Sequence, residues 1–429
     1  MKKLILASLA AAVTLVSCTQ ESVVDPSITA AASTKTISYS PYAGASSTRG
    51  SAVNSNSDFC GTEGSYGSFK VSAYNETDQY FDFDQITYGG SSWAGTTTRY
   101  WPAEDATFHF GAYYPAGATF STDPAFSYAS DANSLTFGYT VAEAVADHED
   151  IMYAITDVTY DASEDPVAVN LHFKHALTQI AFTATKDDDL AVTVNSVTIC
   201  NVVDNGTFKA TATTTDSNVS GGTTANASVT TSNAGSWTPA TAAANSSTNT
   251  ANESENIQHY AAAMSYDNDE SYTTVTKSTV VALSDATDVL MLLPQKLTAW
   301  SDSKTYTASG SNDGVAYGTD SYLAIVCTIA DSTGAVIVDE GTVYVPFDSA
   351  VNYNGDEDTT DTGEDSWQAG YKLTYNLHFG GGYSVPGGTT PEPGEVPDPD
   401  DAVLTLRTIT YTVTVDEWKT PSSDSDVSL

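Results

Sequence analysis

Basic residues are scarce in this chain. Its 429 residues include 15 Lys and Arg against 54 Asp and Glu, which gives a formal net charge of -39. A surface of this charge repels phosphate groups, and no basic stripe offsets it, so we exclude nucleic acid as a partner. Hydrophobic residues still make up 41% of the chain, with 25 Tyr and 14 Phe. That supply suffices for sizeable cores, and the length predicts about two domains.

Long hydrophobic runs are also missing. The apolar run from Leu4 to Val13 is shorter than the roughly 20 residues that span a bilayer. It follows two lysines and precedes Leu15-Val16-Ser17-Cys18, which is the order of a secretion signal. A Cys directly after Leu-Val-Ser resembles a bacterial lipobox, so we expect removal of residues 1–17 and lipidation of Cys18, whose acyl chains anchor the protein to a membrane. An ordinary secretion signal with a coincidental Cys is the alternative.

Cysteine is the third scarcity. Besides Cys18, the chain has only Cys60, Cys200 and Cys327. Three thiols cannot all pair, and a chain of this length does not depend on disulfides. Cys327 ends the apolar run 322–327, where a small core residue is expected. A bridge between Cys200 and Cys327 stays open.

Alternation of apolar and polar residues is the dominant pattern in the rest of the sequence. It runs through residues 108–114, 167–175, 343–347 and 371–379. Each run has one apolar and one polar face, as in a strand that covers a core. Gly, Asn, Asp and Pro clusters separate the runs at short intervals. The predicted fold class is all-β, with sandwich or barrel architecture.

Composition divides the chain into segments. We expect an N-terminal arm (18–49), an N-terminal domain (50–186) that ends at an acidic break, and a C-terminal domain (187–384). The C-terminal domain carries a low-complexity insertion at 210–256, rich in Thr, Ser, Asn and Ala. A stiff Pro-rich acidic linker (385–402) leads to a tail (403–429).

The tail begins with a strong strand sequence. One face of residues 403–415 holds Ile409, Tyr411, Val413 and Val415, and the other holds Leu404 and Leu406, so a bend near Arg407 is expected. A terminal strand on a spacer suits presentation to another molecule. It also suits folding back onto its own domain, and the pattern does not choose between the two.

Several segments, taken in order, resemble the fimbrillin family, the type V pilins of Bacteroidetes. Four groups of motifs carry the resemblance: Arg99-Tyr100-Trp101-Pro102 with the aromatic strand 108–115; Asp150-Ile151-Met152-Tyr153-Ala154 with 171–177; Leu292-Leu293-Pro294-Gln295; and 367–375, from Trp367 to Tyr375. They span about residues 36 to 379.

The resemblance implies two transthyretin-like β-sandwich domains with a C-terminal strand extension. It also implies a structural subunit of a cell-surface fimbria that contributes to adhesion. In the family, a lipidated precursor reaches the outer membrane, and a trypsin-like protease cuts after an Arg in the N-terminal arm. The first strand then dissociates and exposes an apolar groove. A strand of another fimbrial subunit fills this groove by strand addition.

This chain offers candidates for each part of that scheme. Ile37 and Tyr39 lie in the strand that would leave. Arg49-Gly50 is the expected cut site, because it stands in a polar stretch that a protease can reach. The expected donor strand is the tail, with Leu404, Leu406, Ile409, Tyr411, Val413 and Val415.

Residues for catalysis are not evident. His172 and His175 are three apart in a strand, which places them on opposite faces and excludes one shared metal. The sequence holds no His-Glu-x-x-His, Gly-x-Ser-x-Gly or P-loop motif, so we expect no enzyme, no cofactor and no metal. The alternative function is a monomeric surface lipoprotein that binds glycans with exposed Trp and Tyr.

Overall fold

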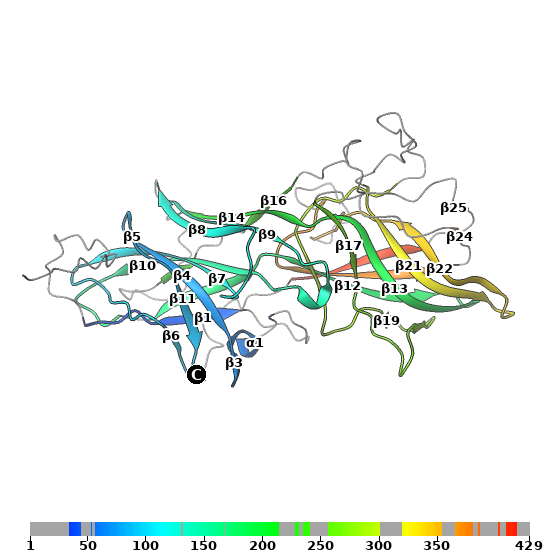
Figure 1. Ribbon diagram of the computed structural model, residues 1–429, viewed down its shortest axis with the longest axis horizontal. Helices are drawn as coiled ribbons and strands as arrows, with labels where there is room; N and C mark the ends of the chain where they lie inside the picture. Colours follow the sequence, from blue (N-terminus) through cyan, green and yellow to red (C-terminus); the bar gives the residue numbers. More distant parts are fainter. Residues whose placement is uncertain are drawn as a thin grey trace, which may run out of the picture.

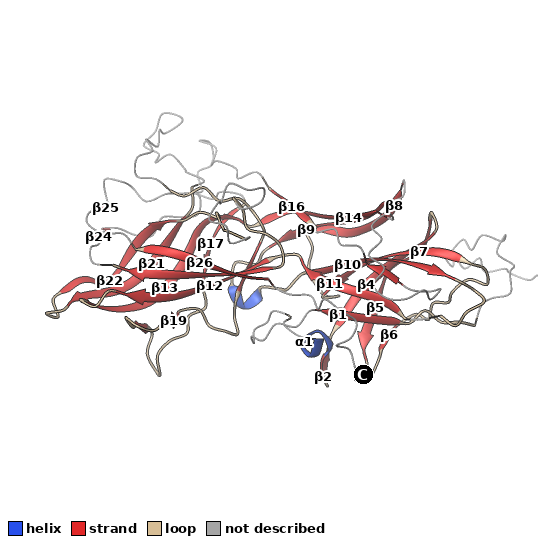
Figure 2. Cartoon of the chain, turned by 180° about the vertical axis from the view of Figure 1, so that it is seen from behind, coloured by secondary structure: helices blue, strands red, loops and turns tan. Residues whose placement is uncertain are grey.

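We describe a computed structural model of the chain. It describes residues 34–43, 53, 56–129, 132–166, 168–213, 228–230, 235–240, 256–300, 320–353, 365–380, 385–386, 402–403 and 409–417. Within these ranges the only helical elements are α1 (Asn56–Cys60) and the 3-10 turn η1 (Val145–Asp147). The molecule is elongated, with strands in two halves (Figures 1 and 2). The predicted all-β class is confirmed.

The largest sheet closes on itself in the first half. Its order is β11-β1-β6-β5-β4-β7-β10-β15, and β10 also pairs with β11. The pair Met152↔His175 closes this ring of strands into a barrel. The strands are β1 (Tyr39–Ala43), β4 (Ser68–Asn75), β5 (Asp78–Tyr88), β6 (Trp93–Gly95), β7 (Ala106–Tyr114), β10 (Met152–Tyr160), β11 (Val169–His175) and β15 (Ser228–Thr230), beside a small hairpin of β2 (Gly61–Thr62) and β3 (Ser65–Tyr66).

Aromatic side chains fill the barrel. Phe69, Phe108, Phe110 and Phe173 are fully buried, and the indole of Trp101 stacks on Tyr160 with ring centroids 4.8 Å apart. The burial of β11 alternates residue by residue, as its sequence predicts. Aromatic pairs in such contact add roughly 1 kcal/mol each beyond their area burial. The barrel core therefore depends on how these rings fit together.

A four-stranded sheet lies beside the barrel, in the order β16-β14-β9-β8. Its strands are β8 (Thr122–Ala129), β9 (Ala132–Thr140), β14 (Asn205–Thr213) and β16 (Ser236–Pro239). A side chain at Gly111 of β7 would lie 2.1 Å from the ring of Phe126. The two sheets can approach this closely only because residue 111 is a glycine.

The low-complexity stretch differs from expectation. The sequence assigns 210–256 to the C-terminal domain, but β14 and β16 pair within the sheet of β8 and β9, and β15 pairs with β10 of the barrel. Phe208 and Ala210 are fully buried. The described strands of this stretch therefore pair with strands of the first half.

Two five-stranded sheets form the second half. One runs β19-β12-β23-β26, with β20 also on β12, and the other runs β17-β13-β21-β22, with β18 on β13. The strands are β12 (Thr178–Lys186), β13 (Leu190–Val203), β17 (Ile257–Ala261), β18 (Thr273–Val275), β19 (Val281–Ala282), β20 (Leu290–Leu292), β21 (Tyr322–Asp331), β22 (Val336–Pro346), β23 (Tyr371–Phe379) and β26 (Thr410–Glu417), with β24 (Val385–Pro386) and β25 (Ala402–Val403) paired alongside.

These two sheets share one core. Phe182 and Tyr375 from the first sheet are buried with Val194 and Ile325 from the second, in the manner of a sandwich. β12 belongs to this sandwich because it pairs with β23 from Gln179 to Lys186. The change of sheet thus falls between β11 and β12, before the acidic break that the sequence suggests. The transthyretin-like detail stays a prediction.

The described cysteines form no disulfide. Cys60 is half-buried, and Cys200 and Cys327 are buried as free thiols. The bridge between Cys200 and Cys327 is therefore absent, and Cys327 is the core residue that its apolar run predicts. Burial raises the pKa of both buried thiols to about 12, which keeps them protonated and unreactive. Within the described ranges, no helix has the length and apolar character needed to cross a membrane.

Candidate subunit-exchange site

The arm strand β1 is an integral part of the barrel wall. It runs parallel to β11 from Tyr39↔Val169 to Ala43↔Phe173, and it meets the antiparallel β6 at Tyr39↔Trp93. The Ile37 amide donates to the Arg99 carbonyl at 2.9 Å. On the other side, the Val169 amide donates to the Ser38 carbonyl at 2.8 Å. Both edges of the arm are therefore hydrogen-bonded.

Ile37 and Tyr39 point into the aromatic core. Their exposed fractions are 8% and 9%. The Tyr39 ring packs edge-on against Phe69 at 6.1 Å and Phe110 at 6.5 Å. Burial of the hydroxyl raises the pKa of Tyr39. Burying each such side chain stabilises the fold by roughly 2 kcal/mol. Departure of β1 would expose the apolar core residues that these two side chains cover.

Lys35 holds the start of the arm. Its Nζ donates to the Ala162 carbonyl at 2.8 Å, and its own carbonyl accepts from the Trp101 amide at 2.9 Å. At the other end, Pro41 lies opposite Leu171. A proline has no N–H, so it weakens the strand that contains it.

The chain is anchored again just after the arm. The Val53 amide donates to Asp150 Oδ2 at 2.7 Å, and Asp150 Oδ1 lies 2.9 Å from His175 Nδ1. Val53 is 4% exposed, and the carboxylate and imidazole are almost completely buried. Arg49 and Gly50 lie outside the described residues, between β1 and this anchor, and so does Cys18. A cut after Arg49 would separate β1 from every later strand.

The tail strand β26 is folded onto its own chain. It is the edge strand beside β23, with Tyr371↔Glu417 at one end and His378↔Thr410 at the other. β1 lies in the barrel half and β26, at the red end of the colour bar, in the sandwich half (Figures 1 and 2). Of the two arrangements that the sequence leaves open, the structure has the tail folded back. Leu404 and Leu406 lie outside the described residues.

One face of β26 packs on the sandwich core. Ile409 is 6% exposed, and Tyr411, Val413 and Val415 are partly buried against the same core. The Tyr411 ring lies 5.5 Å from Phe347, and its hydroxyl accepts from the Asp348 amide at 3.3 Å. The intervening threonines are exposed. The face expected from the sequence is thus the buried face.

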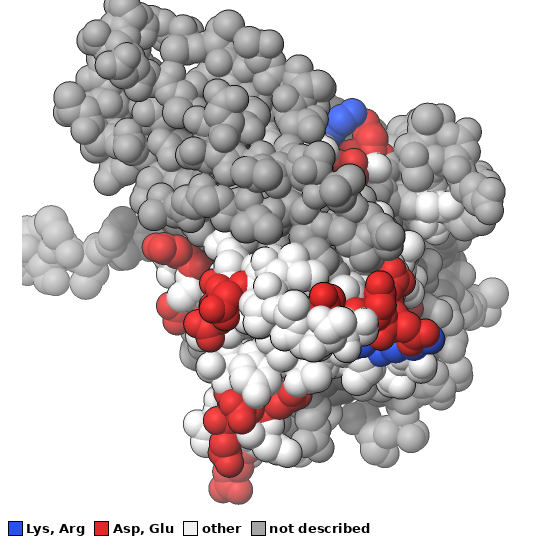
Figure 3. All heavy atoms as spheres, turned by 90° about the vertical axis from the view of Figure 1, so that its right-hand side faces the viewer, with Lys and Arg blue, Asp and Glu red and all other residues white. Residues whose placement is uncertain are grey.

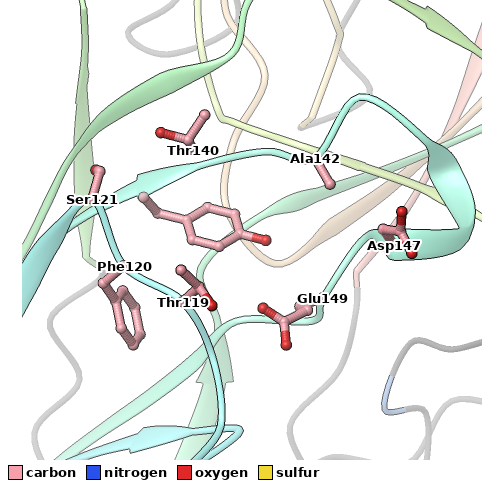
Figure 4. Close-up of a pocket in the computed structure, with 8 residues that line it drawn as sticks. Thr119, Phe120, Ser121, Thr140, Ala142, Asp147 and Glu149 are labelled. Carbon is pink, nitrogen blue, oxygen red and sulfur yellow. The ribbon is translucent and has the colours of Figure 1, made fainter.

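A pocket of about 310 Å³ lies outside both strands. It is lined by Thr119, Phe120, Ser121, Tyr139, Thr140, Ala142, Asp147 and Glu149 (Figure 4). Burial raises the pKa of Glu149, and a hydrogen bond from the Thr119 amide offsets part of that effect. Carboxylates and hydroxyls without any Lys or Arg suit a neutral polyhydroxylated ligand and disfavour an anion.

The His, acidic and Trp side chains of the described residues were the other candidates for a metal or sugar site. No group of three or more His, Cys, Asp or Glu is placed to hold a metal ion among them. His172 and His175 alternate between half-buried and buried positions, on opposite faces as predicted. Trp101, Trp300 and Trp367 are core residues, and Trp93 and Trp237 are half-buried. None of these five indoles is exposed, but three tyrosines are: Tyr80, Tyr100 and Tyr266.

Acidic side chains gather on the surface. The end view of the sandwich half shows many Asp and Glu and few Lys or Arg (Figure 3). One of the few bases, Lys277, is paired with Asp188. This surface agrees with the net charge of -39.

Sequence reasoning missed several residues of this site. They are Lys35, Val53 and Asp150. The Lys35 ammonium binds the backbone carbonyl of Ala162, and the Val53 amide binds Asp150; both contacts join positions more than ninety residues apart. A sequence pattern reports on neighbours along the chain, so no local signal marks such contacts. Asp150 lies in a family-like motif, but that motif does not show what the carboxylate binds.

The family profile described as fimbrillin-like matches residues 52–396. The chain therefore belongs to the fimbrillin-like family, which assigns it a fimbrial or adhesion role at the cell surface. Its structure is similar to that of a fimbrial protein from Bacteroides vulgatus, with 16% identity, a TM-score of 0.48, and coverage of 90% of this chain and 100% of that one. A candidate cell adhesion protein from Bacteroides uniformis has 13% identity, a TM-score of 0.40, and coverage of 90% and 99%. None of the curated proteins matches this chain in sequence.

Proposed function

We propose that this chain is a fimbrial subunit that assembles by donor-strand exchange. Lipid on Cys18 holds the precursor at the outer membrane, and a trypsin-like protease cuts between Arg49 and Gly50. The arm strand β1 then leaves the barrel, and the tail of another subunit takes its place. The observation that carries the proposal is the position of β1 between β11 and β6, upstream of the cut site.

Loss of β1 would open the closed barrel at two edges. The free edges of β11 and β6 would expose unpaired amides and carbonyls beside the aromatic core of the barrel. Exposed strand edges of this kind recruit another strand, which supplies main-chain hydrogen bonds and alternate side chains for the pockets. An opened barrel therefore favours one kind of occupant, an extended apolar-polar strand.

The tail has the properties of that occupant. One face of β26 is apolar and packs against a core, and in the described structure β26 pairs with a single neighbouring strand, β23. In the opened barrel it would have two neighbours. Because the tail of each subunit would enter the barrel of the next, the contact is heterologous and propagates into a fibre.

A second function rests on the pocket of about 310 Å³. A monomeric surface lipoprotein could bind a glycan there, with Asp147 and Glu149 accepting hydrogen bonds from sugar hydroxyls. No described indole lines this pocket, and its aromatic lining is limited to Phe120, which is half-buried, and Tyr139, which is buried. We therefore favour strand exchange.

The test is limited proteolysis of the chain that lacks the signal and Cys18. Trace trypsin should release a new N-terminus at Gly50, read by mass spectrometry, and fibres should follow in light scattering and electron microscopy. Arg49→Gln should resist both steps, and deletion of 403–429 should permit the cut without growth. A chain that is cut at Arg49 and remains monomeric at high concentration contradicts the proposal, and glycan-array binding by such a monomer would support the second function.

A further inference from the structure

The arm and the tail contain nearly the same sequence. The arm reads Lys35-Thr36-Ile37-Ser38-Tyr39-Ser40, and the tail reads Arg407-Thr408-Ile409-Thr410-Tyr411-Thr412. Thr, Ile and Tyr are identical, and the other positions exchange one base or one hydroxyl residue for another. A third segment, Ile86-Thr87-Tyr88, shares three residues, but Asp84-Gln85 precedes it and Gly89 follows it. Shared strand periodicity alone does not require this six-residue match.

We infer that the tail of one subunit enters the next barrel in the register and direction of β1. Ile409 takes the place of Ile37, Tyr411 that of Tyr39, Val413 that of Pro41, and Val415 that of Ala43. The inference rests on the proposed strand exchange and adds the register, the direction and the occupant, which is a second copy of this chain.

Each position of the repeat meets a specific partner in the barrel. Lys35 Nζ donates to the Ala162 carbonyl, the Ile37 amide donates to Arg99, and the Ser38 carbonyl accepts from Val169. The backbone contacts do not depend on the side chain, so Ile409 and Thr410 can repeat the last two. The Arg407 guanidinium, like the Lys35 ammonium, is a cationic donor for a carbonyl oxygen.

Tyrosine is the position that sets the register. The Tyr39 ring packs between Phe69 and Phe110 in the barrel, and the Tyr411 ring packs against Phe347 and Tyr375 in the sandwich. Both sites thus hold a tyrosine ring against two aromatic rings, edge-on to both at Tyr39 and edge-on to Tyr375 at Tyr411. A slip of one residue would turn the whole apolar face of the tail outward.

The tail is the better strand of the two. Val413 supplies the N–H that Pro41 lacks, and Val415 is bulkier than Ala43. β-branched residues favour strands, and proline does not. The exchange therefore replaces a weak strand with a stronger one of matching shape, which favours the assembled state over the starting state.

Engineered cysteines test the register. In β1, Ser40 lies opposite Asn170 of the parallel strand β11, so the inferred register places Thr412 opposite Asn170. The paired strands lie about 5 Å apart, within the Cα separation of a disulfide. In the mature chain with Cys60→Ser, the pair Asn170→Cys and Thr412→Cys should cross-link after trypsin and mild oxidation. A matched control combines Asn170→Cys with Thr414→Cys, which shifts the register by two residues and keeps the same face.

The expected result is a covalent ladder of subunits for the 412 pair and a band at least about tenfold weaker at dimer size for the 414 pair. The uncut chain should give no ladder with either pair. Fibres that cross-link equally through the 414 pair, or through neither pair, overturn the register while strand exchange stands. A cut chain that forms no fibre in any background overturns both.

A peptide measurement gives an independent readout. A fluorescent peptide of residues 407–417 should bind the cut chain that lacks 403–429, and unlabelled peptide 34–43 should compete for the same groove. Tyr411→Ala in the peptide should weaken binding at least about tenfold, because it empties the aromatic pocket. Thr412→Ala should leave binding within about twofold, because its equivalent in β1 lies outside the core. Equal affinities for the Tyr411→Ala and wild-type peptides would overturn the inference.

Discussion

The ring of Tyr411 lies 5.6 Å from that of Tyr375, across the pairing of the tail strand with β23. The tail is therefore folded in cis before any processing. The same tyrosine is the residue that matches Tyr39 of the arm, which packs in the other half of the molecule. One short sequence thus fits two apolar sites, and the proposed assembly requires it to move from one to the other.

The first prediction concerns the stability of the tail in cis. Tyr411→Ala should lower the free energy of unfolding by about 1–2 kcal/mol, less than a fully buried aromatic would, because Tyr411 is only partly buried. Thr410→Ala, on the exposed face of the same strand, should change it by less than about 0.5 kcal/mol. Urea denaturation followed by Trp fluorescence measures both, and similar losses for the two variants would contradict the described packing.

The second prediction concerns the strength of the arm strand. Pro41→Val should replace a residue that disfavours strands with one that favours them, so it should slow the departure of the arm after cleavage. Fibre growth should then show a lag at least about threefold longer, while the rate of cutting at Arg49 stays the same. Ser40→Thr, which keeps the hydroxyl type and the backbone, serves as the matched control. Faster growth for Pro41→Val would show that departure of β1 does not limit assembly.

The third prediction concerns the anchor behind the cut site. Asp150→Asn replaces the carboxylate that pairs with buried His175 and accepts from the Val53 amide. Loss of this charge should destabilise the barrel by about 2–3 kcal/mol. It should also speed amide hydrogen exchange at Val53. Asp187→Asn breaks the half-exposed pair with His378, and it should cost less than about 1 kcal/mol. Equal costs for the two variants would remove the anchoring role.

The fourth prediction concerns acid. Burial lowers the pKa of His148 to about 4, although the hydrogen bond to the Ala142 carbonyl offsets part of that effect. The Met291 amide donates to Nδ1 at 3.1 Å, so this nitrogen carries no proton and the ring is neutral. The unfolded chain takes up this proton near pH 6.5 and the folded chain only near pH 4, so stability falls as pH falls through that window. The loss from this group is on the order of 3 kcal/mol.

Urea titrations at several pH values between 7 and 4 measure the effect. His148→Gln should unfold with a smaller dependence on pH across this window, even though it is less stable than wild type at pH 7. Thr410→Ala, at an exposed position without a titratable side chain, should keep the wild-type dependence. An unchanged slope for His148→Gln would contradict the described environment.

Much of the strand content is readable from the sequence. The alternating runs at 108–114 and 371–379 are strands. The apolar face of the tail is also correct. These features follow from period two, which depends only on near neighbours along the chain.

Long-range pairing is what the sequence did not disclose. β14 pairs with β9 and β15 pairs with β10, both outside the second half of the molecule. β12 joins the sandwich ahead of the acidic break. The polar low-complexity composition gives no sign of the few buried side chains, such as that of Phe208, that accompany this pairing. The sequence also does not tell whether the tail packs on its own chain or on another subunit, because its alternating pattern suits both arrangements.

The most direct test of strand exchange is to follow the mature chain after a single cut at Arg49. The account predicts that the fragment carrying Ile37 and Tyr39 leaves and that fibres then grow, with no growth once residues 403–429 are deleted. A cut chain that keeps its arm fragment and stays monomeric, or fibres that grow equally well without the tail, would contradict it.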